Sequence, residues 1–319
     1  MTDVAVSAPG KLLIAGEYAM LEGGDAIAVA INCRAYARLS RDRAERGVDS
    51  LPLQASQARA AAERSVGEVP LHLAVDVSEL RYMGKKLGLG SSSAISAAAA
   101  AAVFAYHGHD LNSSAVRDHI MEVALTTHRT VIPHGAGADV GAATLGGIIH
   151  FSQQGKSFEM RPLTWPEQLK MKAVWSGAEA DTGELIKQVR ELVKRDAPGY
   201  RGLIDALSAK AHDCLDALRK ADVERVVKSL DEYGRAMRAL GQAAQAPVFT
   251  DTLDRIAQIA RESGGAAKPS GAGGGDVAVA LFSSDEDATR FSAKCREQNL
   301  YVLGCRLDTR GVRVELINK

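Results

Sequence analysis

Residues 85–95, KKLGLGSSSAI, form a glycine- and serine-rich segment directly ahead of an alanine-rich run. Glycines let the backbone approach a ligand closely, and the first N–H groups of a helix have no partner within that helix, so the two features together can bind a phosphate group. The serine hydroxyls add hydrogen bonds or a ligand for a magnesium ion. The segment therefore predicts a phosphate-binding loop followed by a helix.

Two common nucleotide-binding loops are excluded. The chain contains no GxxxxGK[ST] pattern, and residues 85–95 do not match the GxGxxG dinucleotide pattern. A serine-rich helix start with glycines in a tight turn would also explain an isolated GLGSS sequence. Further segments of the sequence are needed to distinguish phosphate binding from a purely structural role.

Three such segments combine small residues with a charged side chain. Residues 8–21, APGKLLIAGEYAML, place Lys11 between a Pro-Gly turn and a strand, where a lone lysine is usually solvated. Residues 134–141, HGAGADVG, place Asp139 where a substrate can approach it, although an isolated Asp there would also cap a turn. Residues 268–276, KPSGAGGGD, offer backbone amides for an anion-binding nest, or form a flexible loop.

The spacing of apolar residues and the positions of glycines predict the strands and helices that must position these residues. Strands are predicted near 3–8, 11–16, 27–40, 71–77 and 145–152, and helices near 55–64, 92–106 and 113–129. From about residue 182 the pattern is helical, most clearly over 221–245, where apolar residues recur at helical spacing and indicate core. In the last part of the sequence, strands are predicted at 276–282, 300–305 and 311–316 around a helix at 285–298.

A chain of 319 residues exceeds the usual size of one hydrophobic core. We therefore expect an α+β fold of two units, 1–165 and 166–319, divided around Pro162 to Pro166. A cleft between two units is a natural place for a small ligand.

Composition excludes several classes of protein. Apolar residues make up 46% and charged residues 24%, which is typical of a globular protein. Lys plus Arg and Asp plus Glu both total 39, so the chain has no net positive charge that would favour nucleic acid or an anionic membrane as a partner. The run from Ala94 to Tyr106 is too short and too alanine-rich to span a bilayer.

The cysteines and the N-terminal residues bear on the compartment. Cys33, Cys214, Cys295 and Cys305 show no CxxC spacing, which argues against a zinc site and a disulfide framework and favours buried reduced thiols. The start, MTDVAVSAPGK, lacks a basic region followed by an apolar stretch, so no signal peptide is expected. We expect a cytoplasmic protein.

Taken together and in order, the segments at 8–21, 85–95 and 268–276 resemble the signature motifs of the GHMP kinases, and the resemblance extends from residue 8 to about 280. It implies an N-terminal β-α-β nucleotide-binding domain, a C-terminal ferredoxin-like α/β sandwich domain, and ATP with Mg²⁺ as cofactors. The implied ATP-binding residues are Lys86, Gly88, Leu89, Gly90, Ser91, Ser92 and Ser93, with Ser92 as the metal ligand.

Within the family, the sequence is most similar to phosphomevalonate kinases. Residues 16–24 read GEYAMLEGG, whereas mevalonate kinases and galactokinases usually have His in place of Tyr18. The KPSGAGGGD segment and the stretch from Trp175 to Glu184 also resemble that subfamily, although Asp181 and Glu184 would equally cap a helix. The implied substrate-binding residues are Lys11, Glu17, Tyr18, Lys85, Lys86, Gly137, Asp139, Ser176, Asp181, Thr182, Ser270, Gly271, Ala272 and Gly273.

The resemblance of residues 134–141 to the GSGxD motif implies that Asp139 is catalytic together with Lys11. With a hydroxyl acceptor Asp139 would act as general base, whereas a phosphate monoester is already anionic at neutral pH and needs only orientation and charge stabilisation. The sequence departs from the family pattern in three places. His128 and Arg129 stand where mevalonate kinases have a magnesium-binding Glu, Ala136 replaces a common Ser, and GLGSS lacks its usual preceding Pro.

The expected activity is ATP-dependent phosphorylation of phosphomevalonate to diphosphomevalonate in the mevalonate route to isoprenoids. The alternatives are a mevalonate kinase or another GHMP kinase, a diphosphomevalonate decarboxylase, or a catalytically silent ligand-binding relative. The expected partners are a phosphorylated carboxylic acid and ATP, with no nucleic acid or membrane, and a homodimer is possible in principle.

Overall fold

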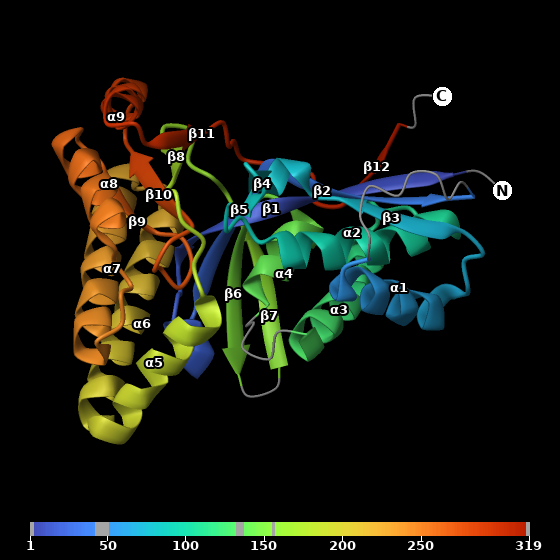
Figure 1. The fold of residues 1–319 in the computed structure, drawn as a ribbon, viewed down its shortest axis with the longest axis horizontal. Helices are drawn as coiled ribbons and strands as arrows, with labels where there is room; N and C mark the ends of the chain where they lie inside the picture. The colour runs from blue at the N-terminus through green and yellow to red at the C-terminus, as the bar shows by residue number, and fades with distance from the viewer. Residues whose placement is uncertain (1–2, 42–50, 132–136, 155–156, 317–319) are drawn as a thin grey trace.

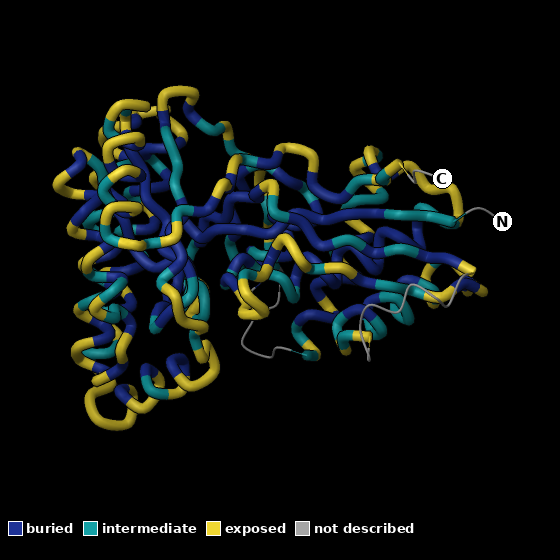
Figure 2. Tube along the Cα trace, turned by 45° about the horizontal axis from the view of Figure 1, so that its top comes forward, coloured by how far each residue is buried: buried dark blue, intermediate teal, exposed yellow. Residues whose placement is uncertain are grey.

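The computed structural model describes residues 3–41, 51–131, 137–154 and 157–316. A first sheet is built on two long antiparallel strands, β1 and β2, which run through the centre of the molecule and are buried over most of their length (Figures 1 and 2). The strand order is β12-β1-β2-β6-β7, and β3 also pairs with β2. The bounds are β1 Val4–Ala15, β2 Ala26–Ser40, β3 His72–Asp76, β6 Ile148–Gln154, β7 Ser157–Leu163 and β12 Arg313–Glu315.

Four α-helices belong to this first part: α1 Leu53–Val66, α2 Ser91–Tyr106, α3 Ser114–Val131 and α4 Ala138–Leu145. Every residue of α2 from 93 to 104 is buried. Its small alanine side chains let the helix lie close to β1 and β2 on one side and to α1 and α3 on the other. Short elements join them: the 3-10 helices η1 Ala19–Glu22 and η2 Ser78–Leu80, and the hairpin strands β4 Arg81–Tyr82 and β5 Lys85–Lys86.

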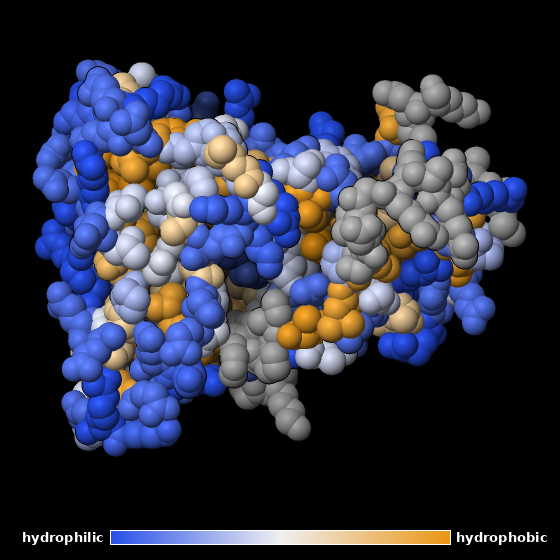
Figure 3. All heavy atoms as spheres, in the orientation of Figure 1, coloured by the Kyte–Doolittle hydropathy of each residue, from blue (hydrophilic) through white to orange (hydrophobic). Residues whose placement is uncertain are grey.

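A second antiparallel sheet, in the order β11-β8-β10-β9, lies with the helices α5 to α9 at the left of Figure 1. These helices present mostly hydrophilic residues on the face seen in Figure 3. Acidic or hydroxyl side chains accept hydrogen bonds at the N-termini of all five, as at Asp181, Asp222 and Ser284. The bounds are β8 Lys170–Trp175, β9 Ala266–Pro269, β10 Val277–Phe282, β11 Tyr301–Leu303, α5 Thr182–Arg195, α6 Ala197–Arg219, α7 Val223–Ala244, α8 Asp251–Glu262 and α9 Asp285–Glu297.

The α+β class is confirmed, and so is the expected helical run after residue 182. The core stripe predicted over 221–245 is α7, whose Leu230, Tyr233 and Met237 are fully buried. One prediction was wrong: the strands expected at 3–8 and 11–16 form the single strand β1. The Pro9-Gly10 pair does not end the strand because a bulge in the pairing with β2 accommodates it.

The last strand, β12, pairs with β1 in the first sheet. After β11 the chain crosses back along β2, with an isolated bridge between Leu307 and Ile31, as the red segment of Figure 1 shows. The segment predicted as the second unit, 166–319, therefore also supplies a strand to the first sheet, and the boundary near residue 165 stays a prediction. In the part of the chain that the structure describes, no helix combines the length and the apolar character that crossing a bilayer requires.

Candidate active site

A cleft of about 650 Å³ is lined by β1 of the first sheet and by the segments around residues 179–183 and 270–276, which adjoin strands of the second sheet. Sixteen of the residues singled out in the sequence line it: Lys11, Glu17, Tyr18, Lys86, Gly88, Gly90, Ser91, Ser92, Ser93, Gly137, Asp139, Asp181, Thr182, Ser270, Gly271 and Ala272. The volume is within the range of small-molecule sites. Segments more than 250 residues apart in the sequence thus meet in one place.

The predicted phosphate-binding loop, residues 85–90, leads directly into α2. Gly90 is the N-cap residue and has a left-handed backbone (φ 76°), a conformation that glycine adopts without the Cβ clash of other residues. The first N–H groups of the 16-residue helix α2 are consequently presented at the cleft. The hydroxyls of Ser92 and Ser93 are buried there without a hydrogen-bond partner among the described residues.

Lys11 lies between the predicted phosphate-binding loop and Asp139. Its Nζ is 3.4 Å from Asp139 Oδ2, and the lysine is only 5% exposed. Gly90 permits this approach, because a Cβ atom there would stand 2.8 Å from Cγ of Lys11. Asp139 is in the first turn of α4, after Gly137 at φ 111°. The arrangement places a buried cation beside the amides that can hold a phosphate, with a carboxylate holding that cation.

His128, on α3, also lines the cleft and is 4% exposed. Its Nδ1 has no hydrogen-bond partner among the described residues. Burial lowers the pKa of His128; the charge of Asp139 acts in the opposite direction, while those of Lys11 and Arg129 add to the lowering. The imidazole is therefore held neutral in the folded protein at neutral pH.

This lowered pKa predicts a pH dependence of stability. Below pH of about 6.5 the unfolded chain takes up a proton at His128 that the folded chain does not, so the free energy of unfolding falls as pH falls, by at most about 1.4 kcal/mol per pH unit. His128→Asn removes this contribution. Urea unfolding at pH 7.5 and 5.5 should show a smaller loss of stability for the variant than for the wild type; equal losses would contradict the prediction.

Glu17 and Lys268 form a buried ion pair that joins the first and third motifs. Lys268 is 0% and Glu17 2% exposed. The Lys268 ammonium donates to Glu17 Oε1 and to the carbonyls of Leu13 (3.3 Å) and Pro269 (2.9 Å), and burial lowers its pKa. Gly271 N–H donates to the same Glu17 oxygen at 3.2 Å. The other oxygen, Oε2, has no hydrogen-bond partner among the described residues, although Glu17 lines the cleft.

Further hydrogen bonds connect the same two motifs. The Tyr18 hydroxyl donates to the carbonyl of Ala272 at 2.5 Å, and Leu13 N–H donates to Ser270 Oγ at 2.8 Å. Tyr18 has φ 63°, which is uncommon for a residue with a side chain, and burial raises its pKa. From α7, the Tyr233 hydroxyl donates to the Glu17 carbonyl at 2.8 Å. These hydrogen bonds hold the third motif against the first in this structure.

The loop before α5 forms another wall. Asp276 accepts from Ala180 N–H at 3.0 Å, and Glu179 accepts from the backbone N–H of Lys86. Burial raises the pKa of Asp276. Asp181 caps α5 by accepting from Glu184 N–H at 2.9 Å and also lines the cleft, so its two predicted roles are compatible.

Four predicted residues do not line the cleft: Lys85, Leu89, Ser176 and Gly273. Leu89 is buried behind the loop, and its carbonyl accepts from Lys11 N–H at 2.8 Å. Ser176 donates its hydroxyl to the nearby Ala178 carbonyl. Gly273 lies against the Val248 backbone, so both residues shape the loops that carry their neighbours.

Glu179 and His128 are lining residues that the sequence did not assign to the substrate. Glu179 had no local signal, whereas His128 was marked only by its place ahead of Asp139. The predicted residues 134–136 lie outside the described residues.

Across the described ranges no group of three or more His, Cys, Asp and Glu side chains could hold a metal. The buried, unpaired hydroxyl of Ser92 nevertheless fits a magnesium ion that is held mainly by phosphate oxygens and water.

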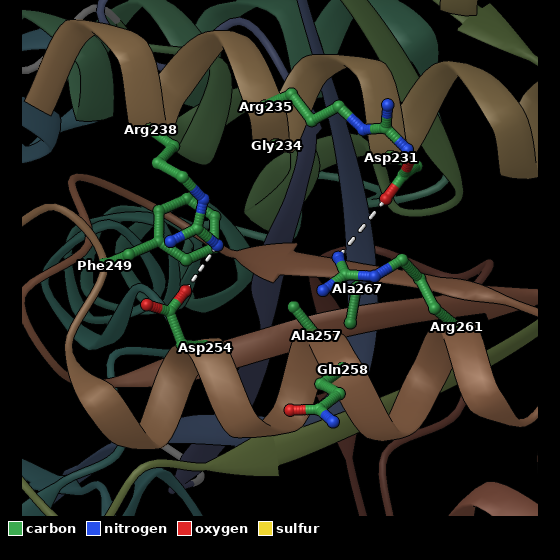
Figure 4. Close-up of a pocket in the computed structure, with 10 residues that line it drawn as sticks. All are labelled: Asp231, Gly234, Arg235, Arg238, Phe249, Asp254, Ala257, Gln258, Arg261 and Ala267. Carbon is green, nitrogen blue, oxygen red and sulfur yellow. Dashed lines mark hydrogen bonds and ion pairs between the residues drawn. The ribbon is translucent and has the colours of Figure 1, made fainter. Parts of the chain in front are cut away.

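A second cavity of about 390 Å³ lies between α7 and α8 (Figure 4). Three arginines line it, and each is paired with an aspartate: Arg235 and Arg261 with Asp231, and Arg238 with Asp254. Each of these guanidinium groups therefore already has a carboxylate partner, and the residues singled out in the sequence line the first cleft instead.

Two family models match the chain: the GHMP kinases N terminal domain over residues 56–147 and the GHMP kinases C terminal model over residues 214–299. Phosphomevalonate kinase of Streptomyces sp. (strain CL190) is 28% identical, covering 91% of this chain and 92% of that protein. Mevalonate kinase of Pyrococcus horikoshii is 27% identical, covering 87% and 88%.

Among solved structures, Streptococcus pneumoniae phosphomevalonate kinase in complex with phosphomevalonate and AMPPNP superposes with a TM-score of 0.80 at 17% identity, covering 96% of this chain and 100% of that one. This likeness shows the fold. The two family models together match more than half of the residues, and the chain belongs to the GHMP kinases.

Proposed function

We propose that this protein transfers the γ-phosphoryl group of ATP to phosphomevalonate, giving diphosphomevalonate. The observation that carries the proposal is the ion pair between the buried Lys11 and the partly exposed Asp139 beside the N-terminus of α2, in one cleft with Glu17 and with residues 270–272 of the third motif. An acceptor that bears both a phosphate and a carboxylate requires local cations, since the chain has no net charge. Lys11 and Lys86 both line the cleft and can supply them.

In this mechanism the N-terminal amides of α2 hold the ATP phosphates, and Lys11 stabilises the charge that develops on the transferred group. Asp139 fixes the Lys11 ammonium in place and orients the acceptor. A bound magnesium ion, held on the protein side by Ser92, would neutralise phosphate charge. The acceptor is anionic at neutral pH, so no residue has to remove a proton from it.

The test is ADP release from MgATP in separate reactions with phosphomevalonate, mevalonate, diphosphomevalonate, homoserine and galactose. We expect turnover with phosphomevalonate alone. Turnover with a different acceptor would reject the proposed substrate but keep kinase chemistry, and silence with all five would reject the kinase and favour a ligand-binding relative.

Mevalonate kinase activity is the second candidate, because a mevalonate kinase is almost as similar, at 27% identity. With that acceptor, Asp139 would have to take a proton from a hydroxyl. The proposal also includes a cytoplasmic location and association into a homodimer.

A further inference from the structure

Cys33 and Cys305 are 272 positions apart in the sequence, yet their sulfur atoms lie 3.5 Å apart. Cys33 is on β2, and Cys305 is at the start of the segment that crosses from β11 back to β12. Leu307 bridges to Ile31 in antiparallel register, and Asn32 N–H donates to the Arg306 carbonyl at 3.0 Å. Continuing that register by one residue places Cys33 directly opposite Cys305.

The hydrogen-bond pattern makes this a pair suited to cross-linking. Asn32 bonds to Arg306, and Asp308 N–H donates to the Ala30 carbonyl, so the alternate pairs, including Cys33 with Cys305, are the non-hydrogen-bonded ones. Cα atoms in such pairs are typically about 4.5 Å apart, inside the range of about 4.4–6.8 Å that a disulfide spans. A small rotation of the two side chains would bring the sulfurs to bonding distance.

We propose that Cys33 and Cys305 form a redox modification site that a two-electron oxidant of the hydroperoxide class converts to an intramolecular disulfide. The sulfur of Cys33 attacks one peroxide oxygen of H₂O₂, giving a sulfenic acid and one water. The sulfur of Cys305 then displaces the sulfenic oxygen as a second water. Two thiols and one peroxide give one disulfide and two waters, with two electrons passing from sulfur to oxygen.

The environment favours Cys33 as the attacking group. It is half-buried, whereas Cys305 is 8% exposed. The hydrogen bond from Cys305 lowers the pKa of the Cys33 thiol, and the thiolate is the nucleophilic form. Cys214 and Cys295 are both fully buried, and burial raises their pKa values to about 12, so they serve as internal controls.

The disulfide would act on the connection between the two sheets. Beyond Cys305 the crossing segment is already anchored to the first sheet, since Arg34 binds Asp308 and the carbonyl of Gly311. A link at Cys305 leaves only Gly304 between this anchored segment and the end of β11. The carbonyl of Cys33 also lies against Gly10, next to Lys11. We expect the link to stiffen the connection between the two sheets that flank the cleft and to slow turnover.

The experiment treats the reduced full-length protein with stoichiometric H₂O₂, then unfolds it so that the buried cysteines also react and counts free thiols with Ellman's reagent, followed by non-reducing peptide mass mapping. We expect the count to fall from four to two, a Cys33–Cys305 linked peptide, and a rise in Tm of roughly 3–8 °C. We also expect kcat to fall by about twofold or more, with recovery after dithiothreitol. Cys33→Ser and Cys305→Ser should lose all of these responses, while Cys214→Ser and Cys295→Ser keep them.

The thiol count and the peptide map do not depend on which acceptor the kinase uses, so they stand apart from the assay of the proposed function. Unchanged thiols, over-oxidation of Cys33 without a linked peptide, or linkage through Cys214 or Cys295 would overturn the site. A Cys33–Cys305 link that leaves kcat unchanged would overturn its effect on turnover.

Discussion

Lys11→Met should lower kcat with MgATP and phosphomevalonate by roughly a hundred- to thousand-fold, the usual effect of removing one preorganised group that stabilises transition-state charge. The methionine keeps the volume of the 5%-exposed side chain but removes the cation 3.4 Å from Asp139. The comparison is steady-state ADP release. The dissociation constant of phosphomevalonate and the Tm are measured alongside, to separate catalysis from binding and folding. Lys194→Met, at an exposed position on α5, is the matched control and should leave kcat unchanged.

The companion variant Asp139→Asn separates the two candidate acceptors. If the acceptor is a phosphate, Asp139 only holds the Lys11 ammonium in place and orients the acceptor. Asp139→Asn should then lose less activity than Lys11→Met. If Asp139 were an obligatory general base, Asp139→Asn would instead lose more activity than Lys11→Met. Complete loss of turnover in Asp139→Asn, with folding and substrate affinity intact, would contradict the proposed mechanism and favour a hydroxyl acceptor.

Lys268→Met should reduce the free energy of unfolding by about 3–5 kcal/mol, because it leaves the buried carboxylate of Glu17 without its cation. The loss should be visible as a shift of the urea midpoint at constant slope. The surface pair between Lys170 and Asp285 provides the control, since Asp285 is 84% exposed and pairs of this kind contribute about 0–1 kcal/mol. Lys170→Met should therefore change stability little.

The double variant Lys268→Met/Glu17→Gln tests the cause of this loss. Replacing the carboxylate by a neutral amide removes the unpaired charge, so the double variant should be more stable than Lys268→Met alone. If the two changes add instead, the destabilisation comes from lost packing of Lys268 against Tyr233 and its neighbours, and the ion pair is not its origin.

The sequence determined those parts of the protein whose structure depends on interactions between residues close together in the chain. The glycines and serines of residues 85–95 predict both a loop and the helix that follows it, and α2 begins at Ser91, one residue before the predicted start. The apolar spacing of residues 221–245 predicts a helix with one buried face, and α7 has it. The motifs around Lys11, Asp139 and Ser270 each have a purely structural interpretation when taken alone, and it was their resemblance, in order, to the GHMP kinases that indicated the residues now found along the cleft.

The tertiary structure alone decided how these stretches meet. The Lys268–Glu17 pair, the return of β12 to β1, and the Cys33–Cys305 contact each join residues more than 250 positions apart. No periodicity or spacing encodes such contacts, because they depend on the register of strands and on which buried groups find partners after the two sheets pack. Lys268 shows the difference most clearly, since a lysine beside a glycine-rich loop reads as a solvated charge until the fold buries it against Glu17.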